Sequence, residues 1–188
     1  NKDSITKKKF NIQKNKKKYF LTILVCPEGL FSETNQLLKL INNNLLFKKN
    51  LRFIFRTHPL INIFSDFQKD HIYRNIIFSK EKNIQNDFNK SDIILYSGSS
   101  VCIQAVMNGL VPINFNNYKN NFSLDPLYKV NNFIIQDSLM LLNLINSIYK
   151  NKYSLRFQKK LNKIQTYSES YFKKLDQDIL LKNIIKNK

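Results

Sequence analysis

The chain alternates short apolar runs with stretches whose apolar residues recur at helical spacing. Each apolar run is bounded by Pro, Gly or polar residues, which is typical of strands buried on both faces of a parallel sheet. Strands are predicted within six ranges: 19–29, 51–59, 75–79, 92–97, 111–115 and 132–135.

The segments between these runs have helical patterns. In 31–47 the apolar residues are spaced as on one helix face, with Ser32 placed to cap the helix and Glu33 in its first turn. Strands that alternate with helices predict an α/β fold, a doubly wound parallel sheet of about six strands with C-terminal helices. Further helices are predicted at 62–70, 82–89, 100–108 and 137–150, and over about 154–186.

The pattern divides the chain into three parts. Residues 1–18 are polar and Lys-rich and are interpreted as a basic linker or arm, 19–153 as a Rossmann-like domain, and 154–188 as Lys-rich helices. No apolar run reaches the roughly 20 residues that span a bilayer, and the N-terminus has neither Met nor an apolar core of signal-peptide length. We therefore expect part of a longer cytoplasmic protein.

The net charge of +18 raises the question of nucleic acid or membrane partners. Only four of the 31 basic residues are Arg, and Lys and Asn occupy polar positions along the whole chain. A selected phosphate-binding face would use more Arg, whose guanidinium pairs bidentately with phosphate. Nucleic acid binding is therefore not expected, whereas peripheral contact with the anionic inner face of a membrane is a further expectation.

The chain's glycines mark a candidate ligand site. There are only three, and Gly29 and Gly98 follow the first and fourth predicted strands, while Gly109 is placed to end a helix in the left-handed conformation. Doubly wound sheets bind ligands at the carboxyl ends of their strands. Gly29 and Gly98 therefore lie where a ligand would bind.

Two motifs near these glycines suggest anion chemistry. In SGSSV (97–101), Ser99 or Ser100 would offer a hydroxyl beside unpaired N–H groups, which suits a phosphate but equally suits a helix cap. In FRTHPL (55–60), Arg56 and His58 end the second strand. The imidazole can donate a hydrogen bond to a phosphoryl oxygen, or else pack against the following proline.

Three other polar residues and the cysteines complete the candidate chemistry. Glu28 could accept hydrogen bonds from sugar hydroxyls or serve as a base, whereas Glu33 is more simply a helix N-terminal acid. The Gln104 amide could reach a ligand's hydroxyls or remain solvated. Cys26 and Cys102 form no CxxC motif, which indicates neither a disulfide framework nor zinc, and no metal or other cofactor is expected.

The run RTHP (56–59), followed by SDIILYSGSSVCIQAVMNGLVPI (91–113), resembles the C-terminal, donor-binding domain of GT-B glycosyltransferases. The similarity is to bacterial enzymes of surface and capsular polysaccharide synthesis, including sialyltransferase-like enzymes with His-Pro and Ser-Ser motifs. It covers roughly 19–150. The resemblance implies a nucleotide-sugar donor, a glycan or lipid-linked acceptor, and an N-terminal acceptor domain that we expect to lie outside the sequence given.

By the same resemblance, His58, Ser99 and Ser100 bind the nucleotide's phosphate. Gln104 stands where many relatives carry a Glu that binds ribose, so the implied ribose contact lacks its usual charge. Two alternatives stay open. One is a nucleotide-sugar 2-epimerase of the same fold, and the other is a non-catalytic basic module that binds nucleic acid or a membrane through 7–18 and the C-terminal helices.

Overall fold

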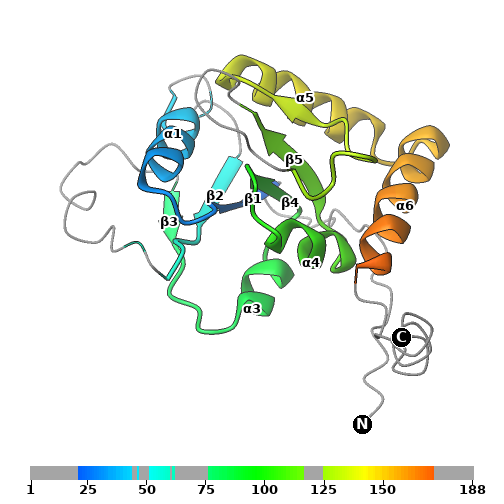
Figure 1. The fold of residues 1–188 in the computed structure, drawn as a ribbon. Coiled ribbons are helices and arrows are strands. Elements are labelled where there is room, and N and C mark those ends of the chain that lie inside the picture. Colours follow the sequence, from blue (N-terminus) through cyan, green and yellow to red (C-terminus); the bar gives the residue numbers. More distant parts are fainter. Residues whose placement is uncertain are drawn as a thin grey trace, which may run out of the picture.

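The structure, a computed structural model, describes residues 21–43, 46, 51–59, 61, 76–116 and 125–171. Its centre is a six-stranded sheet in which every neighbouring pair is parallel and the strand order is β3-β2-β1-β4-β5-β6 (Figure 1). This confirms the predicted doubly wound α/β fold. The strands are β1 (Leu21–Cys26), β2 (Leu51–Phe55), β3 (Ile76–Phe78), β4 (Ile93–Tyr96), β5 (Val111–Phe115) and β6 (Ile134–Ile135).

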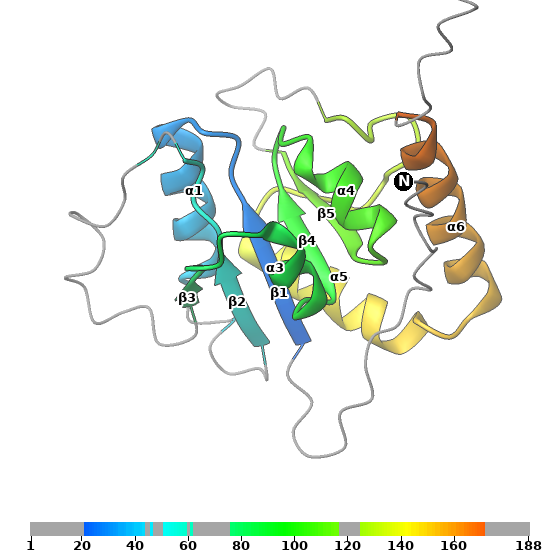
Figure 2. The ribbon, with the colours of Figure 1, turned by 90° about the horizontal axis from the view of Figure 1, so that it is seen from below.

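Helices cover both faces of the sheet. α1 and α5 lie on one face and α3 and α4 on the other, while α6 packs beside α4 (Figures 1 and 2). Among the described helices, none is both long enough and apolar enough to cross a bilayer. The helices are α1 (Phe31–Ile41), α3 (Ile84–Asn89), α4 (Val101–Met107), α5 (Ser138–Asn151) and α6 (Leu155–Ser170).

Some predicted segments lie outside the described residues. They are the basic arm at 1–18, the helix expected at 62–70, and the part of the C-terminal helices beyond 171.

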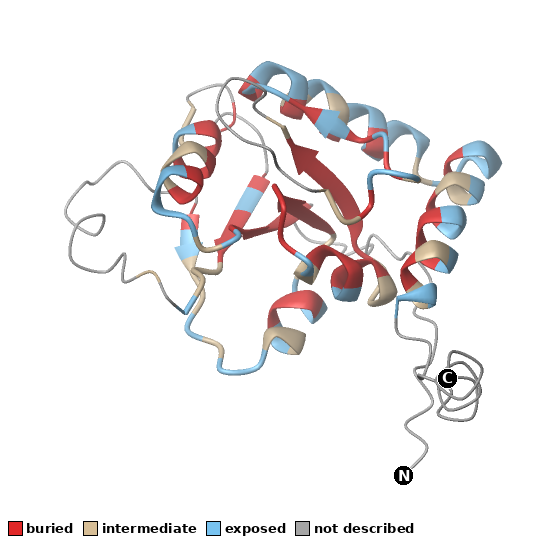
Figure 3. Cartoon of the chain, in the orientation of Figure 1, coloured by how far each residue is buried: buried red, intermediate tan, exposed pale blue. Residues whose placement is uncertain are grey.

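The core follows the central strands, because helices on both faces leave no solvent-facing side. Ile23 of β1 pairs with Phe53 of β2 on one side and Ile93 of β4 on the other, and all three side chains are fully buried. Figure 3 shows the central strands as a continuous buried layer between helices whose outer faces are exposed. The continuous apolar runs in the sequence reflect this double coverage.

The start of α1 differs from the sequence prediction. Ser32 does not cap the helix: the N-cap position is Leu30, and Ser32 lies inside the first turn. No side chain caps this helix, and Glu33 Oε2 instead accepts a hydrogen bond of 2.8 Å from the main-chain N–H of Glu28, in the loop before the helix. The first turn of α1 is thereby tied to the loop that follows β1.

The end of α4 agrees with the prediction for Gly109. This residue has φ 85°, in the left-handed region. Its N–H donates to Val106 O (2.9 Å), and the N–H of Leu110 donates to Ala105 O (3.0 Å), the bond pattern of a Schellman motif. Gly109 therefore ends the helix and directs the chain into β5.

Candidate active site

The strand order reverses between β1 and β4. From β1 the chain continues to β2 and β3 on one side, and β4, β5 and β6 follow on the other. In open α/β sheets, ligands bind outside the carboxyl ends of the strands at this kind of switch point. The loops that follow β1 and β4 both leave the sheet at its upper edge in Figure 2.

The loop after β1 contacts His58, which lies three residues beyond the end of β2. Gly29 has φ 109°, and a Cβ built on it would lie 3.0 Å from both Cγ and Nδ1 of His58. Any larger residue at this position would be strained and would also displace the imidazole. The glycine is therefore required both by the turn and by the approach of the histidine.

The same loop reaches the end of β4 through a carboxylate. The side chain of Glu28 lies so close to Gly98 that a Cβ there would be 2.7 Å from Glu28 Cδ and Oε1. Residues from the ends of three adjacent strands, β2, β1 and β4, therefore meet. As the sequence suggested, Gly29, His58 and Gly98 come together, and Glu28 joins them.

The serines after β4 differ in exposure. Ser99 is buried, whereas Ser100 is exposed and occupies the N-cap position of α4 without a side-chain capping bond. The main-chain carbonyls of Ser99 and Ser100 accept the first hydrogen bonds of the turn, from Cys102 N (3.2 Å) and Ile103 N (3.1 Å). The capping alternative for the Ser100 hydroxyl is not observed, and its phosphate-binding role stays a prediction.

Gln104 lies one turn into α4 and is exposed, whereas its neighbours Ile103 and Ala105 are buried. Its main-chain carbonyl accepts a hydrogen bond of 2.9 Å from Asn108 Nδ2. The amide side chain is thus on the solvent side of the helix. Its contact with ribose stays a prediction.

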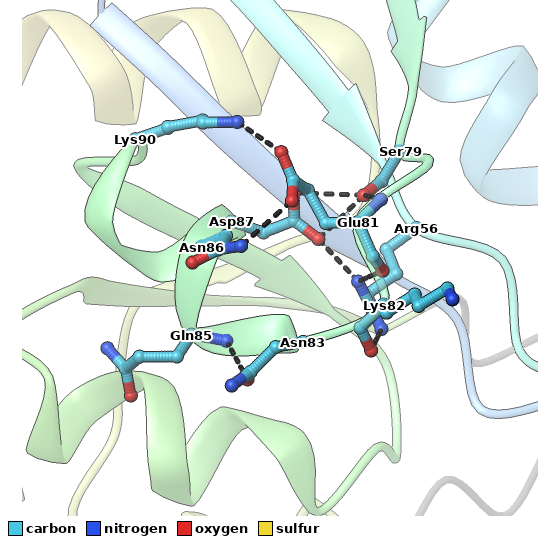
Figure 4. Close-up of polar contacts among 9 residues, drawn as sticks. All are labelled: Arg56, Ser79, Glu81, Lys82, Asn83, Gln85, Asn86, Asp87 and Lys90. Atoms are coloured by element: carbon cyan, nitrogen blue, oxygen red, sulfur yellow. Dashed lines mark hydrogen bonds and ion pairs between the residues drawn. The ribbon is translucent and has the colours of Figure 1, made fainter.

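Arg56 directs its guanidinium into the protein (Figure 4). Nη1 donates to Asp87 Oδ2 at 2.6 Å and to the carbonyl of Glu81 at 2.9 Å. Asp87 is buried and also accepts a hydrogen bond of 2.7 Å from Ser79 Oγ. Arg56 therefore ties the end of β2 to α3 and to the loop after β3, two residues before His58, and its predicted contact with the donor stays a prediction.

Glu33 is the residue whose environment the sequence analysis missed. Only 3% of it is exposed, and Oε1 has no hydrogen-bond partner among the described residues. Burial raises the pKa of the Glu33 carboxyl from 4.5 to about 7, with a smaller contribution from the negative charge of Glu28, against the opposing hydrogen bond from the Glu28 N–H. A signal was present, since Glu33 is spaced four and eight residues before the buried Leu37 and Ile41.

A second polar cluster supports the end of β4. The hydroxyl of Tyr96, which is fully buried, donates to Asp125 Oδ1 (2.9 Å) and accepts from Asn131 Nδ2 (3.0 Å). Burial raises the pKa values of both Tyr96 and Asp125. The segment at 125–131 is thereby held against the strand that leads into Gly98.

The described residues contain no group of three His, Cys, Asp or Glu side chains that could hold a metal ion. Cys26 and Cys102 are both buried and form no disulfide. Burial raises the pKa of the Cys26 thiol to about 12. Burial raises the pKa of the Cys102 thiol as well. Both thiols are therefore protonated at neutral pH, and a protonated thiol is a poor nucleophile.

Comparison with known proteins adds a fold relationship. No protein-family model matches the chain, and no curated protein matches it. The solved glycosyltransferase of kitacinnamycin matches with a TM-score of 0.57 and 8% identity, over 87% of this chain and 42% of that one. The wall teichoic acid polymerase TagF, in a structure soaked with CDPG, matches with a TM-score of 0.47 and 16% identity, over 89% and 43%.

The chain therefore spans less than half the length of these solved structures. At such identities the likeness concerns the fold. In fold, the chain resembles one half of a glycosyltransferase.

Proposed function

We infer that this chain is the donor-binding half of a glycosyltransferase that moves a sugar from a nucleotide-sugar to a polysaccharide or lipid-linked acceptor. The observation that carries the proposal is the meeting of Glu28, Gly29, His58 and Gly98 at the β1–β4 switch point. The fold likeness to a solved glycosyltransferase supports the same class. The other half, which would carry the acceptor, is also a proposal.

His58 is the proposed partner of the donor's phosphate. Its imidazole can donate a hydrogen bond to a phosphoryl oxygen and, when protonated, offset the charge that develops as the nucleotide departs. The hydroxyl of Ser100, which makes no capping bond, is proposed to donate a second hydrogen bond to the phosphate. Ser99 is proposed to take part as well, although it is buried. Gly98 lets the ligand approach the main chain between these groups.

Glu28 has a different proposed role. Its carboxylate is exposed and lies against Gly98, where it would repel a phosphate but accept hydrogen bonds from hydroxyls. We therefore assign it to the sugar side of the donor, as a hydroxyl acceptor or as a base. Arg56 is proposed as a positioning residue, because Asp87 and the carbonyl of Glu81 already accept from its guanidinium.

Calorimetric titration with CMP, UDP and GDP tests the binding proposal. At least one nucleotide should bind, and His58→Ala should weaken it by about tenfold or more, because a hydrogen bond to a charged group is lost. Ser100→Ala should weaken it less. Asn143→Ala, an exposed change on α5, is the matched control and should bind like the parent.

Binding of no nucleotide would overturn the proposal, as would equal affinity for His58→Ala and the parent. Product analysis with nucleotide-sugar alone addresses the reaction class. If the nucleotide-sugar is epimerised when no acceptor is present, the protein is a 2-epimerase and not a transferase.

A further inference from the structure

The connection between α5 and α6 has an unusual charge pattern. Between Asp137 and Glu169 the sequence contains no acidic residue. The basic residues in this interval are Lys150, Lys152, Arg156, Lys159, Lys160 and Lys163. Four of them, Lys150, Arg156, Lys159 and Lys163, are exposed, so every exposed charge that this interval contributes is positive.

Large apolar and aromatic side chains are exposed at the same place. Tyr149 is 48% exposed, Tyr153 66% and Leu155 80%. The ammonium of Lys152 lies 4.4 Å from the ring centroid of Tyr149 and 5.1 Å from that of Tyr153, so it sits near both rings. We name Tyr149, Lys150, Lys152, Tyr153, Leu155 and Arg156 the basic-aromatic corner.

The fold does not need these side chains for its core. α5 contributes Ile145 and Ile148 to the core, and α6 contributes Phe157, Leu161 and Ile164. The corner residues are not part of this core, and all of them are exposed except Lys152, which is half-buried. Large apolar and aromatic side chains that are exposed next to one another mark a candidate interaction site.

We propose that the basic-aromatic corner docks on the surface of an anionic lipid bilayer. Lys and Arg side chains near such a surface are attracted to the negative headgroups, while their methylene stems lie along the interface. Tyr rings suit the boundary between headgroups and acyl chains, with the hydroxyl in water, and Leu155 enters the apolar side. The corner supplies all three kinds of contact.

Nucleic acid is a poorer partner for this surface. A phosphate backbone would attract the basic residues, and the tyrosines could stack on bases, but neither contact would bury Leu155 against an apolar surface. Only one of the corner's three basic residues is Arg, the residue that recognises phosphate bidentately. The exposed Leu155 at the start of α6 therefore favours lipid.

The corner also lies away from the candidate active site. In Figure 2 the α5–α6 connection is at the lower right, whereas the loops after β1 and β4 leave the sheet at the top. Docking through the corner would leave those loops free. The inference therefore does not depend on the proposed function.

The chain contains no Trp, so a single introduced Trp reports on its own surroundings. Tyr153→Trp places this probe in the corner. Tyr128→Trp is a matched control, because Tyr128 is also 66% exposed and also has a Lys beside its ring, that of Lys129. Mixed vesicles of phosphatidylglycerol and phosphatidylcholine are compared with pure phosphatidylcholine vesicles.

With the mixed vesicles, emission of the Tyr153→Trp variant should shift to the blue and be quenched by brominated acyl chains. The Tyr128→Trp variant should show neither effect, and pure phosphatidylcholine should bind weakly. Equal responses from the two variants, or none from Tyr153→Trp, would overturn the proposal.

Charge variants test the basic residues separately by vesicle sedimentation. The corner variant combines Lys150→Gln, Lys152→Gln and Arg156→Gln with Lys159→Gln, the next exposed basic residue on α6. It should lower vesicle affinity by more than about a hundredfold, at roughly fivefold for each basic residue. A control with the same charge change uses Lys39, Lys80, Lys82 and Lys129, all exposed elsewhere. This control should bind at least tenfold more tightly than the corner variant by the same principle.

Equal losses in the two variants would mean that net charge alone drives binding, and would overturn the assignment to the corner. RNA or duplex DNA binding that is lost in the corner variant, without vesicle binding by the parent, would assign the surface to nucleic acid instead.

Discussion

The imidazole of His58 lies directly against Gly29, so close that a methyl group on Gly29 would sit 3.0 Å from the ring atoms Cγ and Nδ1. Gly29 also has φ 109°, a backbone conformation that L-residues rarely adopt. The turn after β1 and the side chain that follows β2 are thus fitted to each other. A substitution at either residue should therefore shift the position of the other.

Gly29→Ala should therefore damage both stability and the site. The positive φ alone costs about 1–2 kcal/mol for a residue with a Cβ, and the clash with the ring adds to this. We expect a lower free energy of unfolding by denaturant titration, and weaker nucleotide binding because His58 is displaced. Ser32→Ala, an exposed change in the first turn of α1, serves as the control. A Gly29→Ala protein with unchanged stability would contradict this turn geometry.

Gly98→Ala should have a different outcome, because its neighbour can move. The added methyl would overlap the Glu28 carboxylate, which is the end of an exposed and flexible side chain. Gly98 itself is buried, but the atoms that the methyl would meet can turn away, so stability should fall by no more than about 1 kcal/mol, the typical cost of a point mutation, while the position of the carboxylate changes.

A double-mutant cycle on donor affinity tests this relationship. Gly98→Ala should weaken nucleotide-sugar binding in the parent and have a smaller effect in a Glu28→Ala background, because the overlap is then absent. Additive effects of the two changes would show that Glu28 and Gly98 act independently, contrary to the observed contact.

Asp87→Ala should be strongly destabilising. It removes the acceptor of a 2.6 Å ion pair with Arg56, and the Asp87 side chain is only 2% exposed. Loss of one partner from a buried pair typically costs about 3–5 kcal/mol, and the 23% exposure of Arg56 places the expectation at the lower end.

The comparison variant is Glu81→Gln, which breaks the exposed pair with Lys90 and should change stability little. Thermal and denaturant unfolding of the two variants should rank them clearly. If Asp87→Ala were as stable as Glu81→Gln, the ion pair between Arg56 and Asp87 would not stabilise the end of β2.

The sheet could be predicted from the sequence because its central strands are buried on both faces. Ile23, Phe53 and Ile93 belong to continuous apolar runs, a pattern that local sequence alone displays. The meeting of Gly29, His58 and Gly98 also followed, since parallel strands bring their carboxyl ends to one edge.

The contacts that could not be predicted join residues far apart in the chain. Arg56 finds Asp87 after 31 residues, and Tyr96 finds Asp125 after 29. Nothing near Arg56 in the sequence indicates that α3 supplies its acceptor. The predicted start of α1 was wrong: Ser is a favoured capping residue, but the N-cap position is Leu30 and no side chain caps the helix.

The buried Glu33 should make stability depend on pH. Its pKa is raised in the folded protein to about 7, whereas the ordinary value of 4.5 describes the unfolded chain. Between these values the folded state holds the proton more tightly, so the free energy of unfolding falls as pH rises through this window and levels off above about 7. The full effect is roughly 3 kcal/mol at most, from a shift of that size.

Glu33→Gln should remove this dependence while keeping an oxygen that can accept from the Glu28 N–H. Denaturant titrations at about pH 5 and about pH 8 should therefore show a larger loss of stability for the parent than for the variant. Other groups titrate in both proteins, so the difference between the two losses is the quantity to compare. Parallel pH profiles would mean that the carboxylate is already ionised without penalty in the folded protein, and that Glu33 Oε1 is satisfied by a partner such as bound water.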